Sequence, residues 1–204
     1  MSHSVKKALD HFKKTDPILY KIAITLDIPE LVPRGDHFYS LVRAITNQQL
    51  SGKAADTIYS RVLKLLPDEK LNASEILKID DSALRSAGLS WNKVSYLKDL
   101  AYKTVHEQIP FESLDKMKEE DIVAELTKIK GIGKWSAEMF LMFHLCRPDI
   151  FSYGDLGLRN AIQKIYVLDK HPTVKEAEEV SIKWSPYRTY ASRILWISLD
   201  KKEV

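Results

Sequence analysis

The sequence predicts an all-α fold of ten to twelve helices with no strand. It contains only seven glycines and eight prolines in 204 residues, whereas all-β chains need many more turns. Apolar residues recur at the i, i+3, i+4, i+7 spacing that places one face of a helix against a core. The prolines lie at plausible helix boundaries and outside these apolar stripes, which favours uninterrupted helices.

Five apolar stripes mark the helices most clearly along the chain, at residues 38–45, 58–65, 94–105, 135–143 and 187–195. Four residues that precede periodic runs are expected to act as N-caps: Asp81, Ser90, Asp155 and Thr173. The segments 28–37 and 147–154 combine prolines and glycines, so we expect them to be hinges. Trp91 and Trp184 are expected in the core, where large aromatic residues usually lie.

Composition excludes several classes of protein. The apolar fraction of 45% and the charged fraction of 29% exclude a mainly disordered chain. No uncharged apolar run approaches the ~20 residues of a membrane span, and the first ten residues lack the apolar core of a signal peptide. The single cysteine, Cys146, excludes an intramolecular disulfide and a four-cysteine iron–sulfur site. The six histidines show no ligand spacing, so we expect no transition metal.

The most informative segment runs from Leu126 to Ala137, where two helical patterns flank a Gly-Ile-Gly turn. Gly131 and Gly133 allow a positive φ and a close approach of another backbone. The second helix offers main-chain N–H groups to an anion at its start, and three lysines, at positions 128, 130 and 134, surround that point. This arrangement suits a sequence-independent phosphate contact. The alternative is a plain turn in which the glycines serve as C-cap and turn residues.

The same segment resembles the hairpin of helix-hairpin-helix DNA glycosylases. In the AlkA-type alkylpurine branch (DNA-3-methyladenine glycosylase II) that hairpin reads L-x-x-[IVLF]-x-G-[IV]-G-x-W-[ST]-A, and every position is filled here. The resemblance places the motif at about residues 120–146. It implies DNA contacts by Lys130, Gly131, Ile132, Gly133, Lys134 and Ser136. It also implies a monovalent cation (Na⁺ or K⁺) on the main-chain carbonyls of Thr127, Ile129 and Ile132.

Asp155 is the candidate catalytic residue. It follows Gly133 by 22 residues (155 − 133), which leaves room for one helix and a reversal of the chain. The family resemblance implies a catalytic aspartate at this spacing. A carboxylate stabilises the positive charge that develops on the sugar when an N-glycosidic bond breaks. The alternative is a helix N-cap. Some relatives carry two adjacent acids here, whereas this chain has Gly154 before Asp155.

Residues 41–51 resemble the family signature A-I-x-x-Q-Q-[LIV]-S. The resemblance implies that Gln49 enters the duplex and fills the gap left by an extruded base, with Gln48 and Ser51 as further DNA contacts. A glutamine can span such a gap and hydrogen-bond to base edges. The alternative is a helix C-terminus whose polar residues face water.

Residues 184–196 resemble the family's C-terminal W-x-P-[WY]-R-x-x-A helix. The resemblance implies a base pocket lined by Trp135 and Trp196, and to this pocket we also assign Met139, Phe151 and Tyr153. Electron-rich ring faces attract cations, and alkylated purines such as 3-methyladenine and 7-methylguanine are positively charged. The alternative is that the tryptophans belong to the core.

These motifs together imply a monofunctional glycosylase. Relatives that also nick the strand place a lysine just after the hairpin as the Schiff-base nucleophile; Trp135 occupies that register here, and Lys134 lies about 100° away on the helix. We therefore expect water to be the nucleophile and an abasic site to be the product. The alternative is a non-catalytic helix-hairpin-helix protein that senses or bridges damaged DNA.

The resemblance extends from about residue 36 to 200 and corresponds to the compact form of the family. We expect one catalytic unit over residues 1–204. One helical subdomain would span about 36–150, and a second, closely packed on it, would combine 1–35 with 151–204, with the active-site cleft between them. The expected partner is double-stranded DNA that contains alkylated bases, with no membrane and no cofactor apart from the monovalent cation. We expect a monomer in the cytoplasm (nucleoid-associated) of a prokaryote or in the nucleus of a eukaryote.

Overall fold

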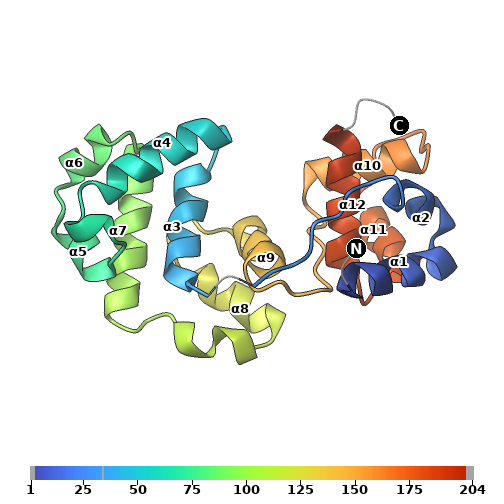
Figure 1. The fold of residues 1–204 in the computed structure, drawn as a ribbon, viewed down its shortest axis with the longest axis horizontal. Coiled ribbons are helices and arrows are strands. Elements are labelled where there is room, and N and C mark those ends of the chain that lie inside the picture. The colour runs from blue at the N-terminus through green and yellow to red at the C-terminus, as the bar shows by residue number, and fades with distance from the viewer. Residues whose placement is uncertain (1–2, 34, 201–204) are drawn as a thin grey trace. The chain divides into compact units, whose positions relative to one another are not determined.

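The structure is a computed structural model that describes residues 3–33 and 35–200. Over these residues the chain forms helices and connecting loops without a strand, so the predicted all-α fold is confirmed (Figure 1). The α-helices within the described residues are α1 (His3–Thr15), α2 (Pro17–Ala23), α3 (His37–Asn47), α4 (Gly52–Leu63), α5 (Ala73–Lys78), α6 (Asp81–Ser86), α7 (Trp91–Val105), α8 (Glu119–Leu126), α9 (Lys134–Phe143), α10 (Leu156–Ile165), α11 (Val174–Ser181) and α12 (Arg188–Asp200). Short 3₁₀ helices are η1 (Pro67–Glu69), η2 (Phe111–Lys116) and η3 (Ile182–Trp184).

The chain divides into two compact units. Unit 1 comprises Met1–Pro33 and Leu141–Val204, and unit 2 comprises Arg34–Phe140. The passage from unit 2 to unit 1 falls inside α9, whereas the sequence led us to place it after residue 150. Residues 1–2, 34 and 201–204 of the expected subdomains lie outside the described residues.

Unit 2 is organised around α7, against which α3 and α5 pack (Figure 1). The Ser90 side chain caps α7 by accepting a hydrogen bond from the Lys93 N–H. Val94, Leu97 and Ala101 then fall on one face and are buried, as their spacing predicts. Burial of a leucine side chain stabilises a fold by roughly 1.5–3 kcal/mol. Burial of this face therefore holds α7 in place within the core of unit 2.

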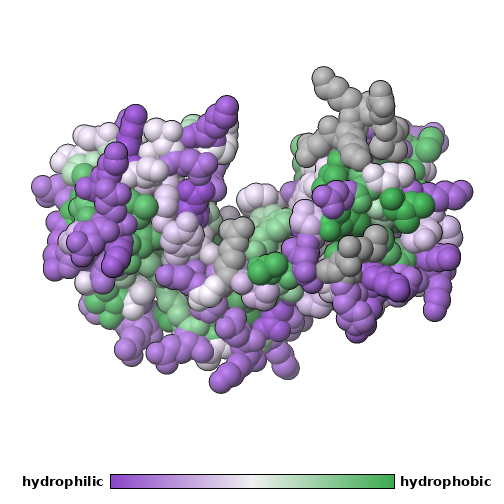
Figure 2. Space-filling view, in the orientation of Figure 1, coloured by the Kyte–Doolittle hydropathy of each residue, from purple (hydrophilic) through white to green (hydrophobic). Residues whose placement is uncertain are grey.

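Unit 1 is organised around α12, which packs against α10 and α2. The core includes Phe12 from α1, Leu19 from α2, Leu158 from α10 and Trp184 from η3, all fully buried. The predicted core position of Trp184 is therefore confirmed. In Figure 2 hydrophilic side chains cover much of the visible surface of both units, as expected when the apolar faces of the helices turn inward.

A buried carboxylate joins three elements of unit 1. Asp16 is 2% exposed, and its Oδ2 accepts hydrogen bonds from the Tyr166 hydroxyl, from Trp184 Nε1 at 2.7 Å and from Lys183 Nζ at 3.0 Å. Its Oδ1 accepts from the Leu19 N–H at 3.1 Å and so caps α2. Burial by itself raises the pKa of Asp16, but the hydrogen bonds outweigh it and hold the pKa below its ordinary value.

Two local predictions were wrong. Trp91 is 60% exposed because, as the first residue of α7, it lies beyond the buried face of that helix. Asp81 lies inside α6, whose cap position is Asp80. The other expected caps are confirmed: Ser90, Asp155 and Thr173 each accept a hydrogen bond from a main-chain N–H of the helix that follows. Among the described helices none has the length and apolar character needed to span a membrane.

Candidate active site and DNA interface

The predicted hairpin joins α8 to α9 within the helix-hairpin-helix segment. Helix α8 ends at the C-cap residue Thr127, and α9 begins at Lys134. Between them Ile129 and Ile132 are buried, and the Ile132 N–H donates to the Ile129 carbonyl at 3.1 Å. The two isoleucines hold the turn in the core of unit 2. Lys130, Gly133 and Lys134 are exposed beside them.

The two glycines of the hairpin have different structural roles. Gly131 has a φ of +79°, and a Cβ placed there would lie 2.1 Å from the Tyr96 ring. Gly133 has no atom within 4 Å of the corresponding Cβ position. The fold therefore requires glycine at position 131, whereas at position 133 the absence of a side chain leaves an open surface that a ligand can approach closely.

The start of α9 presents main-chain N–H groups to this open surface. The first N–H of α9 that bonds four residues back is that of Ala137, to the Gly133 carbonyl at 3.0 Å. The N–H groups of Lys134 and Ser136 precede it, in the first turn, where an α-helix favours an anion. The Lys130 N–H differs, since it donates to Asp99 Oδ2 at 2.8 Å inside the unit.

A depression of about 580 Å³ lies beside the hairpin within unit 2. Its lining combines predicted site residues with residues of the α7 start: Gln48, Gln49, Ser90, Asn92, Lys93, Tyr96, Gly131, Trp135 and Ser136. The structure thus brings the paired glutamines, one glycine of the hairpin and the hairpin tryptophan to one surface. The Trp135 side chain is 52% exposed.

The two glutamines point in different directions. Gln48 Nε2 donates to the Gly131 carbonyl at 2.8 Å, so this amide braces the hairpin. Gln49 is exposed and has a φ of +56°, a left-handed conformation that non-glycine residues rarely adopt. Ser51, also exposed, occupies the N-cap position of α4 without a side-chain capping bond. Such a turn, with an exposed Gln49 at its corner, suits a residue that projects toward a partner.

Lys93 contributes to this surface but was not identified from the sequence. Its Nζ donates to the Thr46 carbonyl at 2.8 Å and to the Gln48 carbonyl at 2.7 Å, which ties the end of α3 to the start of α7. Burial lowers the pKa of Lys93. No sequence signal indicates this role, because the partners are main-chain carbonyls about 45 residues earlier in the chain.

Asp155 lies in unit 1 at the N-cap of α10. Its Oδ1 accepts two hydrogen bonds, from the Leu158 N–H at 2.8 Å and from Trp196 Nε1 at 3.1 Å. A Cβ at Gly157 would lie 3.1 Å from Asp155 Oδ1 and 3.3 Å from Trp196 Nε1, so glycine leaves room for this pair. The capping interpretation and the catalytic one are therefore compatible, since the cap fixes one carboxylate oxygen in place.

A scan against protein-family models identifies the chain. Residues 42–186 match the HhH-GPD superfamily of base excision DNA repair proteins. The chain belongs to this superfamily. It is 35% identical over 161 residues to DNA-3-methyladenine glycosylase 1 of Schizosaccharomyces pombe, which covers 78% of this chain and 71% of that protein. The resemblance that the motifs indicate is thus confirmed.

Two solved structures show the same HhH-GPD architecture. A DNA-3-methyladenine glycosidase from Bacillus halodurans aligns with a TM-score of 0.84 at 32% identity, covering 98% of this chain and 90% of that one. The S. pombe 3-methyladenine DNA glycosylase Mag1, in complex with abasic DNA, aligns with a TM-score of 0.82 at 31% identity, covering 97% and 98%. As a member of the HhH-GPD superfamily, the chain is a base excision DNA repair protein.

The residues assigned to the base pocket of this HhH-GPD chain differ in exposure and partners. In unit 2, Trp135 is exposed and Met139 half-buried. In unit 1, the Trp196 ring lies 5.8 Å from that of Phe143, centroid to centroid. Phe151 is 4% exposed and packs against the buried Trp184 ring, which makes it a core residue. The Tyr153 hydroxyl accepts a hydrogen bond from Arg188.

Proposed function

We propose that this protein is a monofunctional DNA glycosylase of the AlkA-type alkylpurine branch. It flips alkylated purines of the 3-methyladenine and 7-methylguanine type out of duplex DNA and hydrolyses the N-glycosidic bond, leaving an abasic site. The observation that carries the proposal is the Asp155 carboxylate, held by the Leu158 N–H and the Trp196 indole. Support comes from the S. pombe and B. halodurans relatives, which are named 3-methyladenine glycosylases.

Asp155 acts on the charge that bond cleavage creates. As the C1′–N bond lengthens, the sugar becomes oxocarbenium-like, and an adjacent carboxylate stabilises that cation. The same carboxylate orients the water that attacks C1′ and accepts its proton. Because N-alkylation already makes the base a cationic leaving group, the base departs neutral without needing a general acid. A single carboxylate therefore suffices, which fits Gly154 in place of a second acid.

Unit 2 supplies the proposed DNA contacts. The first-turn N–H groups of α9 hold a phosphate over Gly133, where no side chain intervenes. Gln49 occupies the gap in the stack that the extruded nucleotide leaves, an extrusion that costs a few kcal/mol and is least costly for damaged bases. Trp135 offers its exposed ring to a cationic base.

The residues present argue for water as the nucleophile. Trp135 holds the register in which strand-nicking relatives carry a lysine, and Lys134 Nζ instead lies 3.9 Å from Glu138 Oε1 on the next turn of α9. With no lysine at that register, we propose that water rather than an amine attacks C1′. Release of the base without strand cleavage follows.

We propose that the main-chain carbonyls of Thr127, Ile129 and Ile132 hold a monovalent cation. Thr127 caps the end of α8, where carbonyls lack partners within the helix. The Ile129 carbonyl accepts one hydrogen bond, from Ile132, and a carbonyl oxygen has a second lone pair. Na⁺ or K⁺ bound there would add positive charge beside the phosphate. We propose no iron–sulfur cluster, since the chain has one cysteine.

We further propose that the protein acts as a monomer on double-stranded DNA with alkylated bases. Its compartment would be the one that holds the genome: the cytoplasm, in association with the nucleoid, in a prokaryote, or the nucleus in a eukaryote.

The Asp155→Asn variant tests the proposed function. Asparagine keeps the size and an oxygen that can cap α10, but it removes the negative charge. We expect release of labelled 7-methylguanine from alkylated duplex DNA to slow on the order of 100-fold or more, with unchanged affinity for abasic-site DNA. Equal release by the variant and the parent would refute the catalytic assignment. No release by the parent would favour a non-catalytic protein that senses or bridges damaged DNA.

A further inference from the structure

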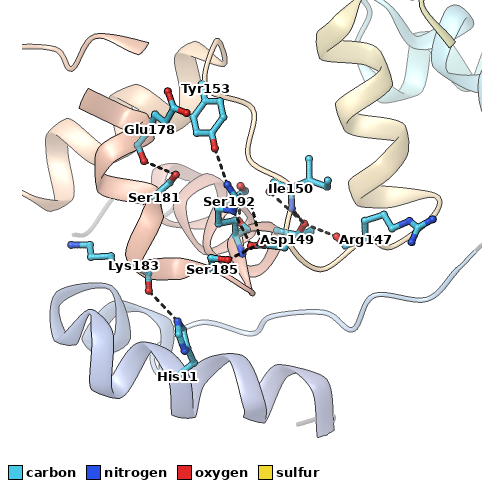
Figure 3. A network of polar contacts seen from close by, with 12 residues as sticks. His11, Arg147, Asp149, Ile150, Tyr153, Glu178, Ser181, Lys183, Ser185 and Ser192 are labelled. Atoms are coloured by element: carbon cyan, nitrogen blue, oxygen red, sulfur yellow. Dashed lines mark hydrogen bonds and ion pairs between the residues drawn. The ribbon is translucent and has the colours of Figure 1, made fainter. Parts of the chain in front are cut away.

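The segment that leads from α9 to Asp155 is held by the first turn of α12. Residues 147–154 contain a proline and a glycine, which favoured a hinge, yet they lie wholly inside unit 1. Figure 3 shows their polar contacts converging on the start of α12. We call residues 147–154 the Asp155 approach segment, since the catalytic candidate follows it directly.

An ion pair forms the first part of this connection. Arg188 Nε donates to Asp149 Oδ1 at 2.8 Å, and Arg188 Nη2 donates to Asp149 Oδ2 at 2.9 Å, a two-pronged geometry. The Arg188 N–H donates to Oδ1 at 3.1 Å, and Ser185 Oγ to Oδ2 at 2.8 Å. Burial raises the pKa of Asp149, but these hydrogen bonds outweigh it and keep the carboxylate ionised with a lowered pKa.

Thr189 adds further hydrogen bonds from a fully buried position. Its N–H donates to the Pro148 carbonyl at 3.0 Å, and its hydroxyl donates to the Arg147 carbonyl at 2.6 Å. The same hydroxyl accepts from the Ile150 N–H at 3.0 Å. Buried main-chain groups of a loop need such partners, and here α12 provides them for Arg147, Pro148 and Ile150 of the approach segment.

The connection extends to within two residues of the catalytic candidate. Arg188 Nη1 donates to the Tyr153 hydroxyl at 2.9 Å, and the Asp155 N–H donates to the Ser152 carbonyl at 3.0 Å. Trp196, eight residues after Arg188 and so about 12 Å further along α12, donates to the Asp155 carboxylate itself. Helix α12 therefore contacts both the approach segment, through Arg188, and Asp155 itself, through Trp196.

We propose that Arg188 is a positioning residue for catalysis, which through Asp149 and Tyr153 sets the place of the Asp155 carboxylate. This inference rests on the proposed function. Arg188 bonds to its own unit through Nε, Nη1 and Nη2 and acts through the approach segment. Misplacement of a reacting group by 1 Å can slow a reaction by about 100-fold. Loosening the approach segment should therefore lower the rate of base release. It should leave DNA affinity unchanged, because the residues of the proposed DNA-binding surface in unit 2 are not altered.

The test compares Arg188→Met, Arg188→Lys and Asp149→Asn. Single-turnover release of 7-methylguanine is measured at saturating enzyme, and affinity for abasic-site DNA is measured separately. We expect Arg188→Met to slow release by about 10- to 100-fold with affinity changed less than about twofold. Arg188→Lys keeps the charge but not the fork, so it should recover part of the lost rate, and Asp149→Asn should resemble Arg188→Met. Lysine replaces arginine imperfectly because its ammonium group lacks the planar, forked donors with which a guanidinium binds both oxygens of a carboxylate.

A matched control separates positioning from general stability. Val5→Ala removes buried methyl groups from the core of unit 1, in α1 and so outside the approach segment and α12. We expect its single-turnover rate to equal that of the parent at a temperature where all variants are folded. If Arg188→Met does not fold, the rate of Arg188→Lys relative to Val5→Ala decides the question.

Three outcomes would overturn the inference. They are a parent-like rate in Arg188→Met, equal slowing in Val5→Ala, and a loss of DNA affinity that accounts for the slowing. Failure of the proposed function has a different signature, since parent-like release by Asp155→Asn would refute it whatever Arg188 does.

Discussion

Replacing the two hairpin glycines by alanine, one at a time, should separate a folding requirement from a binding requirement. At Gly131 alanine must adopt a φ of +79°, which costs about 1–2 kcal/mol. Its Cβ would also lie 2.1 Å from a Tyr96 ring carbon, an overlap that costs typically 1–3 kcal/mol to relieve. The sum, roughly 2–5 kcal/mol, corresponds to a fall in Tm of about 4–20 °C for a chain of this size.

At Gly133 the same substitution meets no strain and no neighbour. No protein atom lies within 4 Å of the new methyl, so Tm should stay within about 2 °C of the parent. If a phosphate contacts the start of α9 there, the methyl holds it away, and affinity for duplex DNA should fall by about tenfold, the factor that 1.4 kcal/mol represents. Thermal unfolding followed by circular dichroism and DNA titration at fixed salt measure the two effects.

The reasoning would be refuted by the opposite pattern. A parent-like Tm in Gly131→Ala would mean that Tyr96 and the turn accommodate a side chain. Parent-like DNA affinity in Gly133→Ala would mean that no phosphate approaches this glycine, and the proposed grip at the hairpin would fail with it. Gly35, in a loop of the same unit with no atom within 4 Å of its Cβ position, provides the control: Gly35→Ala should change neither quantity.

Two further predictions concern unit 1. Trp196→Phe keeps an aromatic ring but removes the indole N–H that donates to Asp155, so single-turnover base release should slow by about tenfold with unchanged affinity for abasic-site DNA; an unchanged rate would show that the hydrogen bond has no part in catalysis. Asp16 has a pKa held below its ordinary value of 3.8 in the folded protein, so its stabilisation is present above that value and is lost as the pH falls through the folded-state pKa. Asp16→Asn should therefore lower the free energy of unfolding by about 1–3 kcal/mol at pH 7 and by less at pH 3, as urea titrations at both pH values would show; an equal loss at both would contradict the assignment.

The features that local sequence determines were predictable. Helix periodicity, the caps at Ser90, Asp155 and Thr173 and the Gly-Ile-Gly turn all depend on residues a few positions apart, and the structure bears them out. The difference between Gly131 and Gly133 was not predictable, because it depends on Tyr96, 35 residues earlier. The same holds for Gln48, whose hydrogen-bond partner is the distant Gly131 carbonyl.

The approach segment shows why composition misleads at a loop. Pro148 and Gly154 indicate a break between helices, and a break there is what the structure has. Whether such a break acts as a hinge depends on the residues that hydrogen-bond to it. Here these are Arg188 and Thr189, which lie about 40 residues later in the chain and so give no local signal. The chain passes from unit 2 back to unit 1 inside α9 instead, where a continuous helical pattern gives no local signal, whereas the first passage, after Pro33, lies in the predicted hinge 28–37.

The charges around the hairpin indicate how DNA is held. Lys128, in the turn after α8, pairs with Glu125 of that helix at 2.6 Å, and Lys134 approaches Glu138 on its own helix, α9, at 3.9 Å, so each of these lysines has a carboxylate nearby in the chain. A lysine that already faces an acid contributes less net attraction to phosphate than an isolated one, and the chain's net charge is only +3. In the proposed function the main-chain N–H groups at the start of α9 make this contact, because N–H groups in the first turn of a helix have no carbonyl four residues back within that helix. Under the proposed function, directional hydrogen bonds at one phosphate, rather than a broad positive field, would fix where the strand lies relative to the Gln49 turn, and flipping a single nucleotide requires such a fixed register.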